Sequence, residues 1–138
     1  MDERAAMQEL YRNDYVTVTE DCGLVAMVWG REEPNDEHAV NTARAIVRAL
    51  DEHLAKGAPA QRYSVLVDLV VVKKNFPRTT MVFTQWLLGH RSVLKGGAFA
   101  TKSFLLRAGI SAAVLVPGFT MKGFTDADEG RRFAKSLL

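Results

Sequence analysis

Cysteine, proline and long apolar runs are scarce in this sequence, and their scarcity excludes several classes of protein. Cys22 is the only cysteine among 138 residues, so an internal disulfide is excluded. The most apolar window, residues 104–116, is too short to cross a bilayer, so no membrane span is expected. The polar residues 1–4 are followed by no apolar run, and a secretory signal is therefore not expected. These features favour a cytoplasmic protein.

Basic and acidic residues are nearly equal in number, but they are unevenly distributed along the chain. The net charge is +2, with −6 on residues 1–70 and +8 on residues 71–138. Such asymmetry can mark an anionic partner for the basic half. Alternatively, the two halves complement each other within one fold or across a homodimer. Nucleic-acid binding is not expected, because a strong net charge and a strand with interleaved basic and aromatic residues are both lacking.

Recognisable catalytic and metal-binding motifs are also missing. His38, His53 and His90 lack metal-ligand spacing with one another, with the cysteine or with carboxylates. There is no Gly-x-Ser-x-Gly elbow and no Gly-rich phosphate motif. Asp21 beside Cys22 raises the pKa of a thiol, which argues against a reactive thiolate. The sequence therefore predicts no catalytic residue, metal or cofactor.

What the sequence does contain is a short buried strand with helical patterns on either side. Residues 63–69, Tyr-Ser-Val-Leu-Val-Asp-Leu, are nearly all apolar, which is typical of a strand buried on both faces. Residues 15–19 and 24–29 predict an antiparallel hairpin, with Gly23 at positive φ in its turn. Apolar residues from Ala39 to Leu54 repeat with the helical period. A helix between two strands implies a parallel crossover to the central strand.

The second half of the chain continues the alternation of helices and strands. The predicted order is β-β-α-β-α-β-α-β-α, an α/β fold with a mixed sheet of about five strands flanked by helices. One domain covers residues 1–138, with residues 1–13 as a short helix or a loose lead-in. A helix is predicted from Pro77 to Gly89 or Leu94, with Thr79 or Thr80 as its cap. A strand at 98–101 and a helix at 104–114 follow, although residues 113–116 could equally form a strand. The last predicted elements are a strand at 121–124 and a helix capped by Thr125.

Candidate binding residues follow the central strand. Asp68 lies at its C-terminal end, where open α/β sheets place their ligands. The other interpretation is that Asp68 accepts hydrogen bonds from nearby amides and fixes the loop. Lys73, Lys74 and Arg78 come next and could bind an anion at a helix N-terminus, or simply form a solvated loop.

The element order and two local patterns resemble the STAS/SpoIIAA-like family of bacterial anti-sigma-factor-antagonist-type domains. The first pattern is the strand 63–69, which ends in Asp-Leu. The second is residues 121–129, Met-Lys-Gly-Phe-Thr-Asp-Ala-Asp-Glu, followed by Arg132-Phe133. The resemblance covers residues 15–138 and implies a sheet flanked by helices with a regulatory or binding role.

The resemblance also implies where a phosphoacceptor would lie. Phosphorylated members carry the acceptor hydroxyl at the start of the helix after the central strand, in an Asp-Ser-Ser-Gly-type sequence that is absent here. Thr79 and Thr80 are the hydroxyls near that position.

Three functional hypotheses result from these patterns. The first is a non-enzymatic regulatory module that binds a protein partner through the loop after the central strand. The second, suggested by related lipid carriers and by apolar excess at 82–88 and 104–116, is a carrier or sensor of a small apolar or lipid-like ligand held between helices and sheet. The third and weakest is an enzyme that uses Asp68 with Lys73 or Lys74 as acid and base.

Overall fold

The structure, a computed structural model, describes residues 7–57, 61–113 and 119–138. It is an α/β fold with a six-stranded mixed sheet and four helices within these residues. The elements in chain order are β1 (Gln8–Arg12), β2 (Val16–Asp21), β3 (Leu24–Trp29), α1 (Asp36–Ala55), β4 (Tyr63–Asp68), α2 (Pro77–Gly89), β5 (Leu94–Ala100), α3 (Phe104–Ala113), β6 (Thr120–Phe124) and α4 (Ala127–Ser136).

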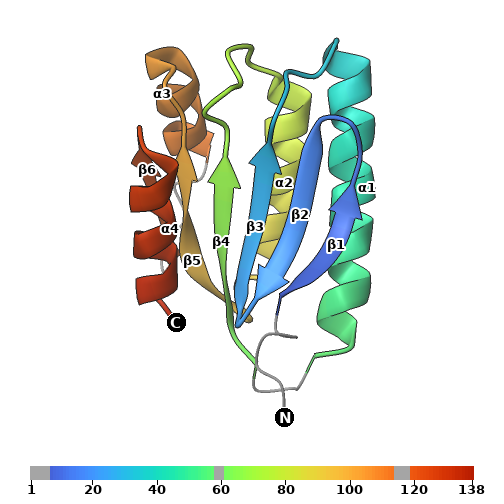
Figure 1. Ribbon diagram of the computed structural model, residues 1–138, viewed down its shortest axis with the longest axis vertical. Helices are drawn as coiled ribbons and strands as arrows, with labels where there is room; N and C mark the ends of the chain where they lie inside the picture. The colour runs from blue at the N-terminus through green and yellow to red at the C-terminus, as the bar shows by residue number, and fades with distance from the viewer. Residues whose placement is uncertain (1–6, 58–60, 114–118) are drawn as a thin grey trace.

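The strands lie side by side in the same order as in the sequence, β1-β2-β3-β4-β5-β6 (Figure 1). The first two pairings are antiparallel and the last three are parallel. Each parallel step is a strand-helix-strand crossover, so the carboxyl ends of β3, β4, β5 and β6 meet at one edge of the sheet. The prediction that the strand at 63–69 is central and pairs in parallel with the hairpin is confirmed, because β4 lies between β3 and β5.

The β2–β3 hairpin has a two-residue loop, because Asp21 pairs directly with Leu24. Both loop residues have positive φ, 51° at Cys22 and 94° at Gly23. This is the geometry of a type I′ turn, whose twist matches that of the strands it joins. The predicted turn, with Gly23 at positive φ, is confirmed.

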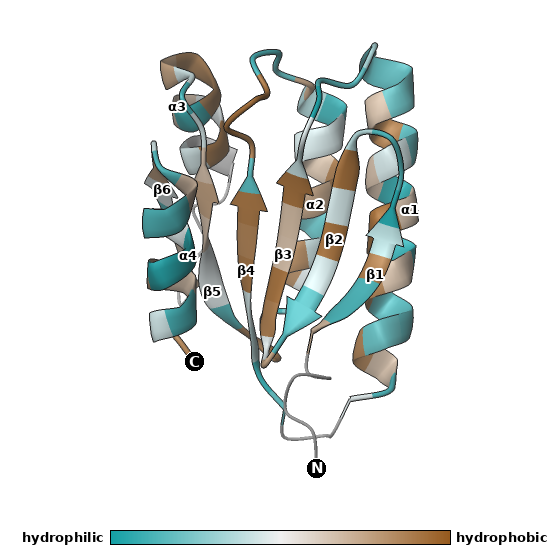
Figure 2. Ribbon diagram, in the orientation of Figure 1, coloured by the Kyte–Doolittle hydropathy of each residue, from teal (hydrophilic) through white to brown (hydrophobic). Residues whose placement is uncertain are grey.

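Helices cover the two faces of the sheet unequally. On one face α1 packs beside α2, and α2 contacts α3, over a large core that includes Val65, Ile46 and Trp86. On the other face α4 packs on β4, β5 and β6 over a smaller core around Leu66 and Ala134. β3 and β4 are hydrophobic over most of their length, as expected for strands with a core on each side (Figure 2).

The first strand and two of the helix caps differ from the predictions. Residues 8–12 form the edge strand β1 rather than a helix or loose lead-in, and residues 1–6 lie outside the described part. The sheet therefore has one strand more than predicted. The cap of α2 is Phe76, which provides no side-chain hydrogen bond, and the cap of α4 is Asp126 rather than Thr125. Asn35 caps α1, and its side chain accepts the backbone N–H of His38.

The third helix and the last strand agree with their predictions. α3 covers residues 104–113, and the strand considered for 113–116 extends into residues outside the described part. β6 covers residues 120–124, where a strand at 121–124 was predicted.

Among the described residues no helix is both long enough and apolar enough to cross a membrane.

Candidate functional site

A cavity lies between α2 and the carboxyl ends of the parallel strands, at the edge where open α/β sheets place their ligands. Trp29 ends β3, Val67 and Phe99 lie near the ends of β4 and β5, and Met121 comes from β6. We call it the α2 pocket; its volume is about 90 Å³. Its lining residues are Trp29, Glu33, Ala39, Val67, Leu69, Val72, Lys74, Phe76, Thr79, Thr80, Phe83, Thr84, Leu87, Phe99, Leu106, Ile110 and Met121.

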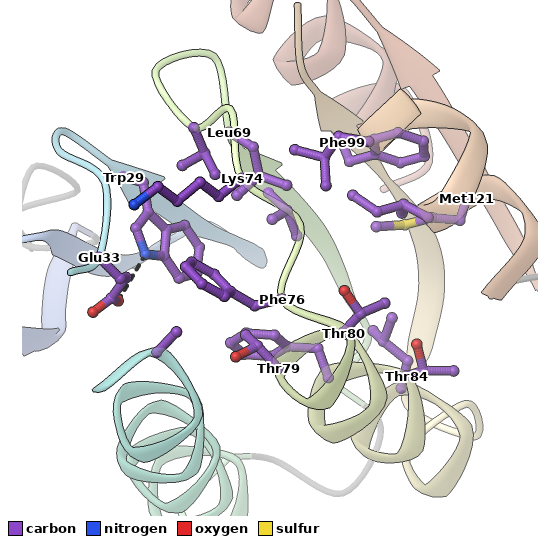
Figure 3. A pocket seen from close by; sticks show the side chains of 17 residues that line it. Trp29, Glu33, Leu69, Lys74, Phe76, Thr79, Thr80, Thr84, Phe99 and Met121 are labelled. Carbon is purple, nitrogen blue, oxygen red and sulfur yellow. Dashed lines mark hydrogen bonds between the residues drawn. The ribbon is translucent and has the colours of Figure 1, made fainter. Parts of the chain in front are cut away.

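Most of the lining is aliphatic or aromatic, and the polar groups are few. Figure 3 shows Trp29 and Phe76 at one end of the pocket, with Phe99 and Met121 at the other. The Trp29 and Phe83 rings meet edge to face at 6.0 Å between centroids, a favoured aromatic geometry. A few polar groups in an otherwise apolar concavity are typical of small-molecule sites.

Glu33 holds the Trp29 wall of the pocket in place. Its side chain is 4% exposed, and its carboxylate accepts three hydrogen bonds. The donors are Trp29 Nε1 at 3.1 Å, His38 Nδ1 at 2.5 Å and Thr42 Oγ1 at 3.3 Å. A buried carboxylate is tolerated only when donors replace its water, and these three do so. The carboxylate thereby fixes the indole and the start of α1 relative to β3.

Glu32 joins the two loops at the mouth of the pocket. Its Oε1 accepts the backbone N–H groups of Lys73 at 2.5 Å and Lys74 at 2.8 Å. Desolvation works to raise the pKa of Glu32, but the hydrogen bonds from Lys74 and Lys73 and the two ammonium charges outweigh it and lower the pKa. The segment after β4 is thus fastened to the segment after β3.

The sequence-predicted site residues separate into two groups. Asp68 is half-buried, and its Oδ1 accepts the N–H of Val70 at 3.1 Å, the loop-fixing role considered as its alternative. Alternation along β4 places Asp68 on the face opposite Val67, so it does not line the α2 pocket. Lys73 is exposed and away from the lining. Arg78 pairs with Asp36 at 3.0 Å and Glu37 at 3.6 Å at the start of α1.

Lys74, Thr79 and Thr80 are brought together at the α2 pocket. Lys74 is exposed, and its stem lies across the mouth beside Trp29 (Figure 3). Thr79 and Thr80 occupy the first turn of α2, and both are half-buried. Phosphorylation of either threonine stays a prediction.

Several lining residues were not among the predicted site residues. Glu33 lies in the connection between β3 and α1, and Leu106, Ile110 and Met121 were predicted only as members of a helix and a strand. No spacing in the sequence could have grouped them, because they come from loops, helices and a strand far apart in the chain. The available signal for Glu33 was a carboxylate beside Pro34 in the short connection between a strand and a helix.

His53, His90 and Cys22 each lie beside a carboxylate. His53 Nε2 lies 2.8 Å from Glu20 Oε1, and His90 Nε2 lies 3.0 Å from Asp51 Oδ1. A hydrogen bond to Asp21 and its charge raise the pKa of the Cys22 thiol, as the sequence suggested. In residues 7–57, 61–113 and 119–138 no group of acidic, histidine or cysteine side chains is arranged to hold a metal ion.

No family model matches the chain, and no curated protein matches it. The resemblance to STAS/SpoIIAA-like domains therefore stays a prediction.

Proposed function

We propose that this protein is a non-enzymatic binding protein for a small, mainly apolar ligand held in the α2 pocket. The observation that carries the proposal is the pocket itself, an apolar cavity of about 90 Å³ between helices and the carboxyl ends of parallel strands. A concave, mainly apolar surface with a few polar groups is the usual form of a small-molecule site.

Ligand exclusion by a larger side chain tests this proposal. Val67 lines the α2 pocket, whereas Val28 lies on the neighbouring strand and packs on the opposite face of the sheet. We expect native mass spectrometry to detect the same retained compound in the wild-type protein and in Val28→Phe, and to find Val67→Phe empty. Clean unliganded masses for all three proteins would contradict the proposal.

A second candidate is a STAS-like regulatory module that binds a protein partner. It is favoured by large apolar side chains left exposed at the start of α3 and on α2: Phe104 is 74% exposed, Leu105 81% and Met81 60%. The exposed Lys73 and Lys74 lie in the loop that leads into α2. Large exposed apolar side chains are often part of protein interfaces.

Reversing the charges of Lys73 and Lys74 tests whether the loop before α2 binds a protein partner. The double variant Lys73→Glu, Lys74→Glu should lose the partner captured by the wild-type protein, and Lys95→Glu, an exposed control on β5, should keep it. Equal capture by all three would count against the loop as the interface.

A further inference from the structure

Two large apolar side chains lie almost fully in solvent on the first turn of α3. Phe104 is 74% exposed and Leu105 is 81% exposed. α3 begins just after the carboxyl end of β5, so both residues lie at the carboxyl edge of the sheet (Figure 1). Leu106 and Ile110 of the same helix line the α2 pocket, whereas Phe104 and Leu105 do not. α3 therefore has one apolar side on the pocket and another in solvent, and Figure 2 shows how hydrophobic its upper end is.

The loop after β4 extends this exposed surface. The N–H of Leu69 donates to the carbonyl oxygen of Ala100 at 2.7 Å, so the loop begins beside the segment that leads into α3. Val71 and Lys73 of the loop are exposed, and so is Lys102 of the neighbouring segment. Apolar side chains and lysines are thus present together at one end of the molecule. We call this group the α3 tip, and its residues are Val71, Lys73, Lys102, Phe104 and Leu105.

The part of the chain that forms the α3 tip has no acidic residue. Residues 69–125 contain neither aspartate nor glutamate. They contain eight basic residues, which are Lys73, Lys74, Arg78, Arg91, Lys95, Lys102, Arg107 and Lys122. A surface built from such a segment carries charge of one sign and attracts an anionic partner.

The acidic side chains at the carboxyl edge of the sheet come from other segments and have other partners or positions. Glu32 accepts the backbone amides of the loop after β4, and Asp36 pairs with Arg78. Asp68 lies on the sheet face opposite the α2 pocket, and Asp126 caps α4, which packs on that same opposite face. The lysines of the α3 tip therefore give it a positive charge on the pocket side of the sheet.

We propose that the α3 tip docks on the surface of a bilayer that contains anionic lipids. Phe104 and Leu105 insert among the lipid head groups, and Lys73 and Lys102 lie at the anionic phosphates and carboxylates. Apolar side chains and basic residues each bind a membrane surface weakly, and stable attachment usually combines the two. This inference goes beyond the proposed function and does not depend on it.

A bilayer suits the α3 tip better than the protein partner of the second candidate. Phe104 and Leu105 stand out from the surface and line no pocket among the described residues. A protein would need a matching concave site for them, because protein interfaces are closely packed. A bilayer surface accepts protruding apolar side chains of any shape and supplies negative charge over a wide area.

Sedimentation with vesicles tests the docking. The purified full-length protein is mixed with vesicles of phosphatidylcholine and with vesicles of equimolar phosphatidylcholine and phosphatidylserine. One double variant, Phe104→Ser with Leu105→Ser, removes the apolar part of the tip. Its control is Leu88→Ser with Leu138→Ser, two exposed leucines near the opposite end of the molecule.

A second pair of variants tests the charge. Lys73→Gln with Lys102→Gln neutralises the tip, and Arg91→Gln with Lys95→Gln removes the same charge from exposed positions around the start of β5. Lys74 is left unchanged because it lines the α2 pocket. Urea unfolding shows whether each variant is folded.

We expect the wild-type protein to bind the mixed vesicles much more tightly than the neutral ones, and to bind less as salt is added. Loss of both apolar side chains should weaken binding about 100-fold, from the apolar surface that no longer enters the interface. Loss of the two tip lysines should weaken binding to the mixed vesicles about 25-fold, or about fivefold for each lysine. Both control variants should bind as the wild type does.

Several results would overturn the proposal. These are a wild-type protein that sediments with neither kind of vesicle, equal binding to neutral and mixed vesicles, and unchanged binding by the folded variant of Phe104 and Leu105. Control variants that lose as much binding as the tip variants would show that the tip is not the docking surface. A protein captured by the wild type and lost by the variant of Phe104 and Leu105, without vesicle binding, would assign the tip to a protein partner instead.

Discussion

Glu32 illustrates how a single side chain shapes the mouth of the α2 pocket. It belongs to the loop after β3, yet it accepts the amides of Lys73 and Lys74 in the loop after β4. These hydrogen bonds restrict the motion of both loops, and Glu32 itself does not line the pocket. Glu32 is therefore a positioning residue, and its effect should appear in stability.

The lowered pKa of Glu32 gives this contribution a definite pH dependence. Because the folded-state pKa is below the unfolded value, the stabilisation is fully present above the unfolded pKa and is lost as pH falls through the folded pKa. At pH 7, Glu32→Gln should be less stable than the wild type by about 1 kcal/mol, the order expected for partly exposed hydrogen bonds to a charged group. The difference should shrink towards pH 3, as measured by urea unfolding.

An exposed carboxylate on α1 provides the matched control for that experiment. Glu52→Gln should leave the free energy of unfolding at pH 7 within about 0.5 kcal/mol of the wild type, as is usual for surface substitutions. A deficit of Glu32→Gln that stays constant from pH 7 to pH 3 would show that the carboxylate charge is not what holds the loops.

At the scale of elements, β5 depends on a close approach to β4. A Cβ on Gly97 would lie 2.3 Å from the carbonyl oxygen of Val65, which belongs to the central strand and cannot move aside. By contrast, a Cβ on Gly109 in α3 would meet nothing within 4 Å. The same substitution should therefore have opposite effects in the two elements.

We expect Gly97→Ala to destabilise the protein by at least about 2–3 kcal/mol, because the parallel pairing of β4 and β5 has to separate. Gly109→Ala should stabilise it by about 0.5–1 kcal/mol through the better helix propensity of alanine. Urea unfolding measures both. A stable Gly97→Ala protein would mean that β5 does not pair with β4 in the observed register.

Most elements could be predicted from the sequence because their apolar residues keep a clear period. The stripe from Ala39 to Leu54 and the run at 63–69 are both of this kind, and both predictions hold. β1 was missed because Gln8-Glu-Leu-Tyr-Arg has two apolar residues side by side and a bulge between Glu9 and Tyr11. The start of α2 was placed correctly at Pro77, but Thr79 and Thr80 lie within the first turn of the helix instead of capping it.

At the scale of the whole molecule, the α2 pocket arises from the sheet order and could not be predicted from local patterns. Three successive crossovers bring the carboxyl ends of β3, β4, β5 and β6 to one edge, and α2 packs there beside α1 and α3. Lys74, Thr79 and Thr80 were identified from their place after the central strand. Trp29, Phe99 and Met121 also line the pocket, but they come from three different strands. Their positions next to α2 result from tertiary packing, which no spacing in the sequence reveals.

A crystal structure of the wild-type protein as purified tests the central claim most directly. The account predicts a retained, mainly apolar ligand between α2 and the sheet, with its carbons against Val67, Phe99 and Met121. A pocket that holds only water, or that is filled by the neighbouring side chains, would contradict it.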